Sequence, residues 1–460
     1  MTIRRATERA ARAALVLLAA ALAACGQREP TGVALIGVTV VDGSGGPPQP
    51  GMVVVTRGSR IEAIVPATRF ELPARTREVD LSGRWVVPGL VDAHAHAAPW
   101  ALERYLAHGV TTVRDVHGAL DSALALRDRL NLNAIAGPRV YSAGAMIDAR
   151  PTTYPDAIGV TNETEARKGV DRLAVANADL VKTYTRITPE LLRAVTDEAA
   201  AFRLRVTSHL GLTDAVTAAG LGVTGIEHLS GVPEAAAADA SPFYAAHRAS
   251  FFAGWTYFER SWAGLDSAAL ERVARALAER KTTLVPTLAL HEIFSRLDRP
   301  EAQQDPDLQV VPEAEMTRWN TPDMVRRAGW TAADFEAFRR GRAKQDLFVR
   351  RFVAAGGRVA AGTDAANQML VPGASMHREL ALLVGAGLTP AQAIAAATSG
   401  GAALLGVDSI GTLAPGKVAD LVVLRRSPYQ NIENTRLIQH VMQRGLLLSG
   451  DSLRTRIIAK

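Results

Sequence analysis

The stretch Val87-Pro-Gly-Leu-Val-Asp-Ala-His-Ala-His96 reads as an apolar strand that ends in two histidines. Side chains two positions apart on a strand point to the same face, so His94 and His96 point together. Seven further strand candidates follow, and amphipathic helices such as 190–202, 268–280 and 390–404 separate several of them. The strand candidates span residues 86–96, 110–116, 139–145, 179–184, 205–209, 225–229, 283–288 and 358–363. Alternating strands and helices indicate parallel βα units, and eight such units close a barrel, so we predict an α/β fold with a (β/α)8 TIM barrel over residues 86–407.

The two ends of the chain carry a different pattern, typical of antiparallel β structure. Residues 33–41 are rich in branched side chains, and a hairpin is expected within 52–65, around a Gly-Ser turn. Near the C-terminus, apolar strands are expected within 419–448. We predict that segments 33–85 and 408–460 pair into one small β-sandwich beside the barrel.

The charge of the chain excludes one class of partner. The formal net charge is +6 over 460 residues, and half of that excess comes from arginines before residue 25. The remaining excess is too small and too dispersed to indicate nucleic-acid binding, so we predict none.

The first residues have the layout of an export signal. A basic stretch precedes an apolar run of about a dozen residues, 13–24, which is too short to span a bilayer of roughly 30 Å as a helix. The run ends at Cys25, the only cysteine, and this ending resembles the lipobox of bacterial lipoproteins. We therefore predict a signal peptide at 1–24, a lipid on Cys25 and a polar tether at 25–32; a plain signal peptide with an incidental cysteine is the alternative. Gly26 after the cysteine favours an exported protein anchored to the outer membrane and facing the periplasm.

Reactive side chains gather where the predicted strands end. The candidates are His94, His96, Lys182, His209, His228 and Asp364. Taken singly, a histidine can be a core residue, a lysine can reach the surface, and an aspartate can cap a helix. Because a barrel exposes the carboxyl ends of all its strands on one face, the joint pattern favours a metal site. Imidazole and carboxylate ligands suit zinc and related divalent ions.

These motifs resemble those of the amidohydrolase superfamily, in its imidazolonepropionase-like and prolidase-like branch. The resemblance rests on residues 87–96, Gly109-Val-Thr-Thr-Val-Arg-Asp115, Ile226-Glu-His228, Gly362-Thr-Asp364 and Gly416-Lys-Val-Ala-Asp-Leu421, and it covers about 33–445. It implies two divalent metal ions, with zinc favoured. One ion would be held by His94, His96 and Asp364 and the other by His209 and His228. A carbamate formed on Lys182 from carbon dioxide would bridge them, and Asp364 would also be the catalytic proton carrier.

Substrate contacts are less well specified by the sequence. His117 lies just after the second predicted strand and Tyr184 ends the fourth, while Arg150 and Arg186 lie in loops where a substrate carboxylate could find a partner. Two long insertions, at about 230–265 and 290–343, are rich in aromatic residues. We expect them to form a partly closed apolar pocket; the alternative is that their rings pack additional helices.

The predicted activity is metal-dependent hydrolysis of an amide bond. The substrate would be a dipeptide with a free C-terminal carboxylate or an N-acyl amino acid, with an aromatic or bulky apolar part. A lactone, a cyclic amide or a phosphoester on the same site is the alternative. A deaminase is disfavoured by Lys182, and a non-catalytic binding lipoprotein by the complete set of ligands. A homo-oligomer is left open.

Overall fold

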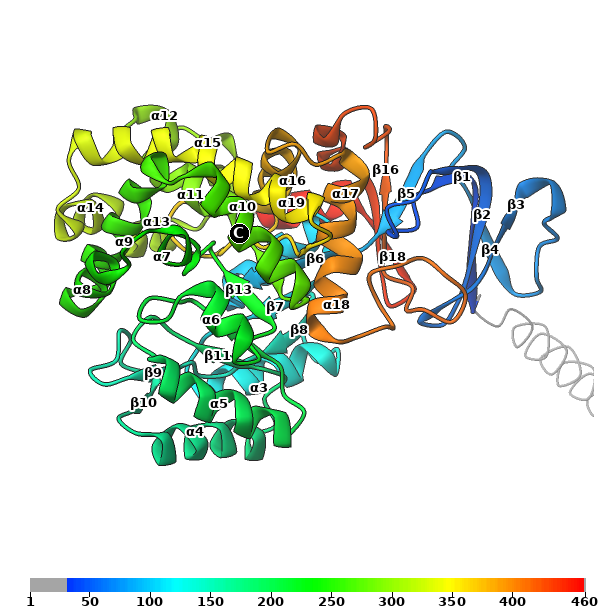
Figure 1. Cartoon of the computed structure of the whole chain (residues 1–460). Coiled ribbons are helices and arrows are strands. Elements are labelled where there is room, and N and C mark those ends of the chain that lie inside the picture. Colours follow the sequence, from blue (N-terminus) through cyan, green and yellow to red (C-terminus); the bar gives the residue numbers. More distant parts are fainter. Residues whose placement is uncertain (1–30, 459–460) are drawn as a thin grey trace, which may run out of the picture.

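The computed structural model describes residues 31–458. The predicted signal peptide and the predicted lipidation site at Cys25 lie outside these residues. Figure 1 shows a β-sheet at one end of the molecule and a larger body of parallel strands and helices at the other. In the described part of the chain, none of the helices combines the length and the apolar character needed to cross a membrane.

The two ends of the chain share one eight-stranded sheet. Its N-terminal strands are β1 (Gly32–Val40), β2 (Gln49–Arg57), β3 (Arg60–Pro66), β4 (Thr76–Asp80) and β5 (Trp85–Pro88). Its C-terminal strands are β16 (Leu421–Leu424), β17 (Ile438–Gln443) and β18 (Leu446–Ser449). β2 and β3 form the expected antiparallel hairpin, and β16 pairs antiparallel with β5, which joins the two ends.

Parallel strands make up the other two sheets, so the α/β fold is as predicted. One contains β6 (Leu90–Ala95), β7 (Val110–Asp115) and β8 (Arg139–Ser142). The other contains β9 (Ile147–Ala149), β10 (Ile158–Val160), β11 (Val181–Thr183), β12 (Val206–Ser208), β13 (Gly225–Glu227), β14 (Thr283–Val285) and β15 (Arg358–Val359). β9 and β10 were not predicted, and the strands that were predicted are shorter than expected.

The single strand predicted over 86–96 is in fact two strands. β5 belongs to the sheet of the chain ends and β6 to the parallel strands, with Gly89 between them. A Cβ atom on Gly89 would lie 2.1 Å from Thr111 Oγ1, so only glycine fits where the chain passes from one sheet to the other. The Pro88-Gly89 pair in the sequence is a local signal for a break, and treating the apolar residues on both sides of it as one strand overlooked that signal.

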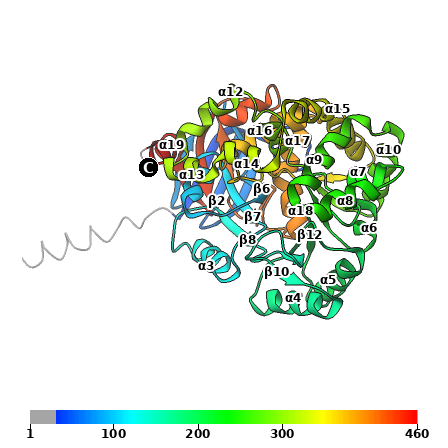
Figure 2. The same ribbon diagram turned by 90° about the vertical axis from the view of Figure 1, so that its left-hand side faces the viewer.

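Helices cover the parallel strands and follow them in sequence (Figures 1 and 2). They are α2 (Leu102–Ala107), α3 (Leu120–Asn131), α4 (Glu163–Val175), α5 (Pro189–Ala201), α6 (Ala215–Gly220), α10 (Ser267–Glu279), α15 (Ala332–Ala354), α16 (Ala374–Gly385), α17 (Pro390–Ala395) and α18 (Gly401–Leu405). α19 (Gly450–Ile458) ends the described chain. Side-chain caps begin several of them; Asp266, for example, accepts from the backbone N–H of Ala269 at 2.8 Å. The helix predicted over 390–404 is interrupted by a π-helical turn at Ala396–Gly400.

Both predicted insertions are helical. The first contains α7 (Val232–Ala236), α8 (Ser241–Ala249) and α9 (Phe251–Ser261). The second contains α11 (Leu288–Phe294), α12 (Pro300–Gln303), α13 (Glu313–Trp319), α14 (Thr321–Ala328) and the start of α15. Some of their aromatic side chains, including Trp319, Trp330, Phe335 and Phe338, are buried in a core of their own. Those rings pack additional helices, which was the alternative expectation, whereas others face the cavity described next.

Candidate metal and substrate site

One cavity of about 460 Å³ opens at the carboxyl ends of the parallel strands. His94 lies in β6 and His96 directly follows it, and Lys182 lies in β11. His209 and His228 directly follow β12 and β13, and Asp364 follows β15 by five residues. All six side chains that the sequence singled out line this cavity, so the structure brings them together.

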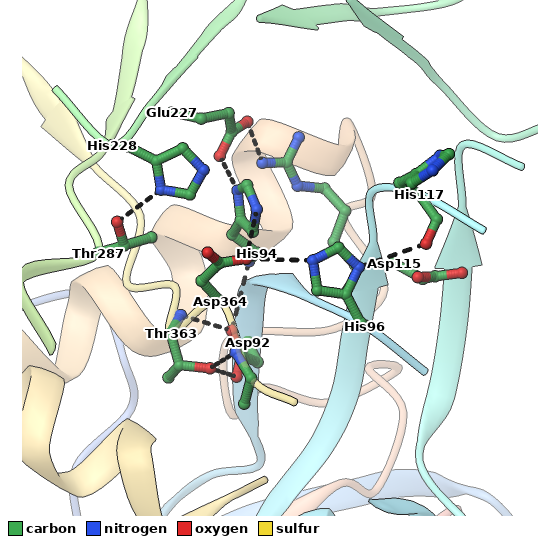
Figure 3. A network of polar contacts seen from close by, with 12 residues as sticks. Asp92, His94, His96, Asp115, His117, Glu227, His228, Thr287, Thr363 and Asp364 are labelled. Atoms are coloured by element: carbon green, nitrogen blue, oxygen red, sulfur yellow. Dashed lines mark hydrogen bonds and ion pairs between the residues drawn. The ribbon is translucent and has the colours of Figure 1, made fainter. Parts of the chain in front are cut away.

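A carboxylate and two imidazoles form its most compact cluster. Asp364 Oδ1 lies 3.2 Å from Nε2 of His94 and 3.1 Å from Nε2 of His96. One ligand atom from each of these residues falls within 4.8 Å of the others, which is the separation of groups that can hold one metal ion. Figure 3 shows the carboxylate of Asp364 between the two rings.

In three of the histidines, the Nδ1 atom contacts an oxygen atom of another residue. His94 Nδ1 lies 2.6 Å from Glu227, His96 Nδ1 lies 3.3 Å from the carbonyl oxygen of His117, and His228 Nδ1 lies 2.8 Å from Thr287 Oγ1 (Figure 3). Such contacts fix the ring orientation and the tautomer, and they leave Nε2 free to bind a metal. The arrangement therefore fits metal coordination through Nε2 of all three rings.

Glu227 supports the site although it was not among the predicted site residues. It is fully buried and also accepts from the guanidinium of Arg114 and from the Thr207 hydroxyl. Burial alone would raise the pKa of Glu227, but Arg114, His94 and Lys182 outweigh burial and hold it well below its usual value. Glu227 thus remains a carboxylate beneath the site. It stands beside His228 in the quoted motif, but nothing in the sequence indicated that it reaches His94.

Lys182 has the environment that carboxylation of its side chain needs. Its side chain is buried, and Nζ has no hydrogen-bond partner among the described residues. Burial lowers the pKa of Lys182 from 10.5 to about 8, so roughly a tenth of the amine is neutral at pH 7, far more than for an exposed lysine. An unpartnered buried amine among metal-binding side chains fits the bridging role that the family resemblance implies.

His209 and His228 complete the group of rings. The ring centroid of His228 lies 4.3 Å from that of His94 and 4.7 Å from that of His209. Burial, reinforced by neighbouring positive groups, holds the pKa of both His209 and His228 well below the usual value. Both imidazoles are therefore neutral at neutral pH, the form that binds a metal ion.

The predicted substrate contacts divide into two groups. Tyr184 and His117 line the cavity, and His117 Nε2 lies 3.1 Å from Asp156. Arg150 and Arg186 are not among the residues that line it, and the Arg186 guanidinium donates instead to the carbonyl oxygen of Arg248 at 3.3 Å. Their contact with substrate remains a prediction.

The rest of the lining comes largely from the two insertions. Phe251, Phe252 and Trp255 of α9 face the cavity, together with Leu290 and Phe294 of α11 and Met324 and Arg327 of α14; Tyr154 joins them from the segment after β9. The expected apolar pocket is therefore present. Arg327 was not predicted, because it is one of several arginines in the second insertion and no local pattern distinguishes it.

Comparison with known proteins places the chain among hydrolases. The sequence profile of the Amidohydrolase family matches residues 85–448. The imidazolonepropionase of Deinococcus deserti is 25% identical over 387 residues, which cover 80% of this chain and 84% of that enzyme. The structure of bottromycin amidohydrolase superposes with a TM-score of 0.71 at 23% sequence identity. The match covers 94% of this chain and 91% of the chain of that protein. A Xaa-Pro dipeptidase with methionine bound in its active site superposes with a TM-score of 0.67 at 22% sequence identity. The match covers 91% of this chain and 100% of the dipeptidase chain. These two structures show a shared fold.

Proposed function

Because this chain belongs to the amidohydrolase family and is a hydrolase that acts on carbon–nitrogen bonds, we propose that it cleaves an amide bond in a small substrate with a free carboxylate. The substrate would be a dipeptide or an N-acyl amino acid with an aromatic or bulky apolar part. One observation carries this proposal: the six metal-binding candidates and the aromatic side chains of the insertions line the same cavity.

The proposal includes two divalent metal ions, with zinc as the favoured metal. His94, His96 and Asp364 would hold one, and His209 and His228 the other. The neutral amine of Lys182 would add to carbon dioxide and release a proton, and the resulting carbamate would bridge the two ions. When bound, the ions would polarise the amide carbonyl and lower the pKa of water at the site.

Side chains of the protein itself would carry out the proton transfers. Burial raises the pKa of Asp364, but His94, His96 and His228 outweigh burial and hold it well below its usual value. Asp364 is therefore ionised and can accept a proton from the attacking water and return it to the leaving nitrogen. Tyr184 lines the same cavity, and its hydroxyl could donate to the carbonyl oxygen as negative charge develops there.

We propose further that the parallel strands close into one (β/α)8 barrel, with the eight-stranded sheet as part of a β-sandwich. Two contacts between the separate parallel sheets support closure. Ala95 at the end of β6 forms a parallel bridge with Ala365, which lies beyond β15. At the other junction, the backbone N–H of Asp179 donates to Ser142 O of β8 at 2.9 Å, just before β11.

A cyclic amide is the second candidate substrate. The relative named imidazolonepropionase aligns with 80% of this chain, and an imidazolone ring contains a cyclic amide. Opening such a ring would use the same residues. A cyclic amide differs from a linear one only in that the acyl group and the leaving nitrogen remain joined in one molecule after the bond is cleaved.

A substrate screen tests the proposed function. The full-length chain, purified in mild detergent with zinc and bicarbonate, would be incubated with dipeptides, N-acyl amino acids and cyclic amides, and mass spectrometry would detect the products. We expect release of free amino acids, loss of turnover in Asp364→Asn, and retained turnover in Asp128→Asn, whose carboxylate lies on the surface. Failure of a preparation that holds two metal ions to cleave any amide would refute the proposed function.

A further inference from the structure

The cavity has an uneven distribution of charge. Asp364 is the only carboxylate among the residues that line it, and this carboxylate already lies against His94 and His96. The nearby Asp156 pairs with His117 and is not part of the lining. A free α-ammonium group on a bound dipeptide would therefore find neutral acceptors such as Thr153, Asn367 and Gln368, but no unpaired carboxylate to balance its charge, and burying a charge without an opposite charge is costly.

A negatively charged carboxylate on the substrate would have a partner in Arg327. This residue is the only arginine in the cavity lining, and Met324, three residues earlier on α14, lines the cavity with it. Its Nε atom lies 2.8 Å from Asp323, and about 60% of its side chain is exposed, so part of the guanidinium is available for another carboxylate. An arginine can bind a carboxylate through two parallel hydrogen bonds, which favours it over a lysine in such a role.

Aromatic rings supply the wall for apolar groups. Tyr184 and Phe251 stack with centroids 6.1 Å apart and an angle of 17° between the rings. Trp255 continues the row, with its ring 6.3 Å from Phe251 at 27°. Flat side chains in nearly parallel orientation offer broad faces to an apolar acyl chain or a planar ring.

We propose that the substrate is an N-acyl amino acid with an uncharged acyl group and an aromatic or bulky apolar side chain, and that Arg327 binds its carboxylate. The proposal rests on the proposed amide hydrolysis and narrows it. A free carboxylate is required and a free amine is rejected, because the cavity offers a cation for the first and no available anion for the second.

Three compounds of almost equal shape separate these requirements. The reference is 4-methylpentanoyl-phenylalanine. Leu-Phe differs from it by an added α-ammonium group, and 4-methylpentanoyl-phenylalaninamide lacks the carboxylate. We expect the reference to have the highest kcat/KM, with each of the other two lower by about tenfold or more, since a charged hydrogen-bonding partner contributes roughly this much.

Two neighbouring arginines provide a matched pair of variants. Arg326 and Arg327 both pair with Asp323, but only Arg327 lines the cavity. We expect Arg327→Ala to raise KM for the reference by about tenfold or more. The same change should leave KM for the carboxamide unaltered, and Arg326→Ala should behave as the wild type with both compounds. Binding of the reference to Asp364→Asn and to the double variant Asp364→Asn/Arg327→Ala, measured by calorimetry, gives a readout that needs no turnover.

The outcomes distinguish the two proposals. Cleavage of all three compounds at equal rates, or equal loss in the Arg326 and Arg327 variants, would overturn the role of Arg327 and leave amide hydrolysis intact. Binding without cleavage of any compound would refute amide hydrolysis, while a loss of binding only in the Arg327 double variant would still support the carboxylate site. Tighter binding of Leu-Phe than of the reference would refute the rejection of a free amine.

Discussion

Buried residues that contact the metal-binding candidates set the orientation of those side chains. Glu227 is the clearest case, because one buried carboxylate contacts His94, Arg114 and Thr207 together. Asp92 has a related position. It accepts from Thr363 Oγ1 at 2.6 Å, and burial raises the pKa of Asp92 to about 7. Asp92 in β6 is thereby linked to the segment after β15, which carries Asp364.

The change Glu227→Gln tests this support. It keeps the shape of the side chain but removes the charge and replaces one of the two acceptor oxygens with an NH2 group, so the side chain can no longer accept from both His94 and Arg114. We expect metal affinity or kcat/KM to fall by about 10- to 100-fold, as when a group behind a metal-bound histidine is lost. Metal content by atomic emission and steady-state kinetics would measure both effects. Glu62→Gln, which breaks an exposed ion pair with Arg57, is the control and should change neither.

Glu379 makes stability depend on pH. Burial raises the pKa of this carboxyl from 4.5 to about 8, although Oε2 accepts from the backbone N–H of Ala289 at 2.8 Å. Between these two pH values the folded protein keeps a proton that the unfolded chain has released. The contribution of this group to the free energy of unfolding is therefore full below about pH 4.5, falls as the pH rises towards 8, and is flat above it.

The variant Glu379→Gln should remove that dependence. Because the amide is neutral at every pH, we expect the variant to gain stability relative to the wild type as the pH rises from 5 to 8, by about a few kcal/mol at most. Urea denaturation at several pH values would measure the difference. A constant difference across the range would show that Glu379 does not carry a raised pKa in the folded protein.

Among the secondary structure elements, the junction between β5 and β6 links the two halves of the fold. The backbone at Gly89 passes so close to Thr111 that no side chain fits between the sheets. Because β6 carries His94 and precedes His96, a shift at this junction would also move the metal-binding candidates.

Gly89→Ala is therefore expected to destabilise the fold. The new methyl group would meet Thr111 Oγ1 and Cγ2, and overpacking of this kind costs about 1–3 kcal/mol. Thermal unfolding would show the loss, and adding Thr111→Ala should recover part of it. Gly264→Ala, where a Cβ atom would meet nothing within 4 Å, should be close to neutral; equal effects at both glycines would contradict the steric explanation.

The insertions show how elements beyond the repeating βα units shape a site. Their helices bury one set of aromatic rings in a separate core and direct another set, with Arg327, into the cavity. The metal-binding candidates lie on the strands and the loops directly after them, whereas much of the apolar wall lies on helices that the insertions supply. The proposed selectivity therefore depends on the insertions and the proposed chemistry on the strands.

For the molecule as a whole, we propose that the lipid anchor predicted at Cys25 determines the location of the protein in the cell. We expect Cys25→Ser to abolish labelling by radioactive palmitate and to move the protein from the membrane fraction to the soluble periplasmic fraction. Catalytic activity should be unchanged, because the parallel strands and the cavity begin far along the chain from this residue. An unlabelled wild-type protein in the soluble fraction would instead support a plain signal peptide.

Most of the strands, several of the helices and the six metal-binding candidates could be predicted from local patterns, whereas β9 and β10 were missed. Alternation and amphipathic periodicity reflect the geometry of a single strand or helix, and side chains at parallel strand ends share one face whatever the loops between them do. His94, His96, Lys182, His209, His228 and Asp364 accordingly line one cavity. Local patterns also indicated β structure at both ends of the chain, although the pairing of β5 with β16 is a contact between distant segments.

Contacts between distant segments were decided by the tertiary structure. The contact from Glu227 to His94 spans 133 residues, and no spacing within one strand encodes it. Arg327 reaches the cavity where Arg150 and Arg186 were expected, because the packing of the insertion helices directs it there. The steric need for glycine at position 89 likewise depends on the approach of Thr111 from another strand. Local sequence thus specifies which groups a strand end carries, whereas side chains packed from elsewhere in the chain set their orientation, their charge state and the shape of the space in front of them.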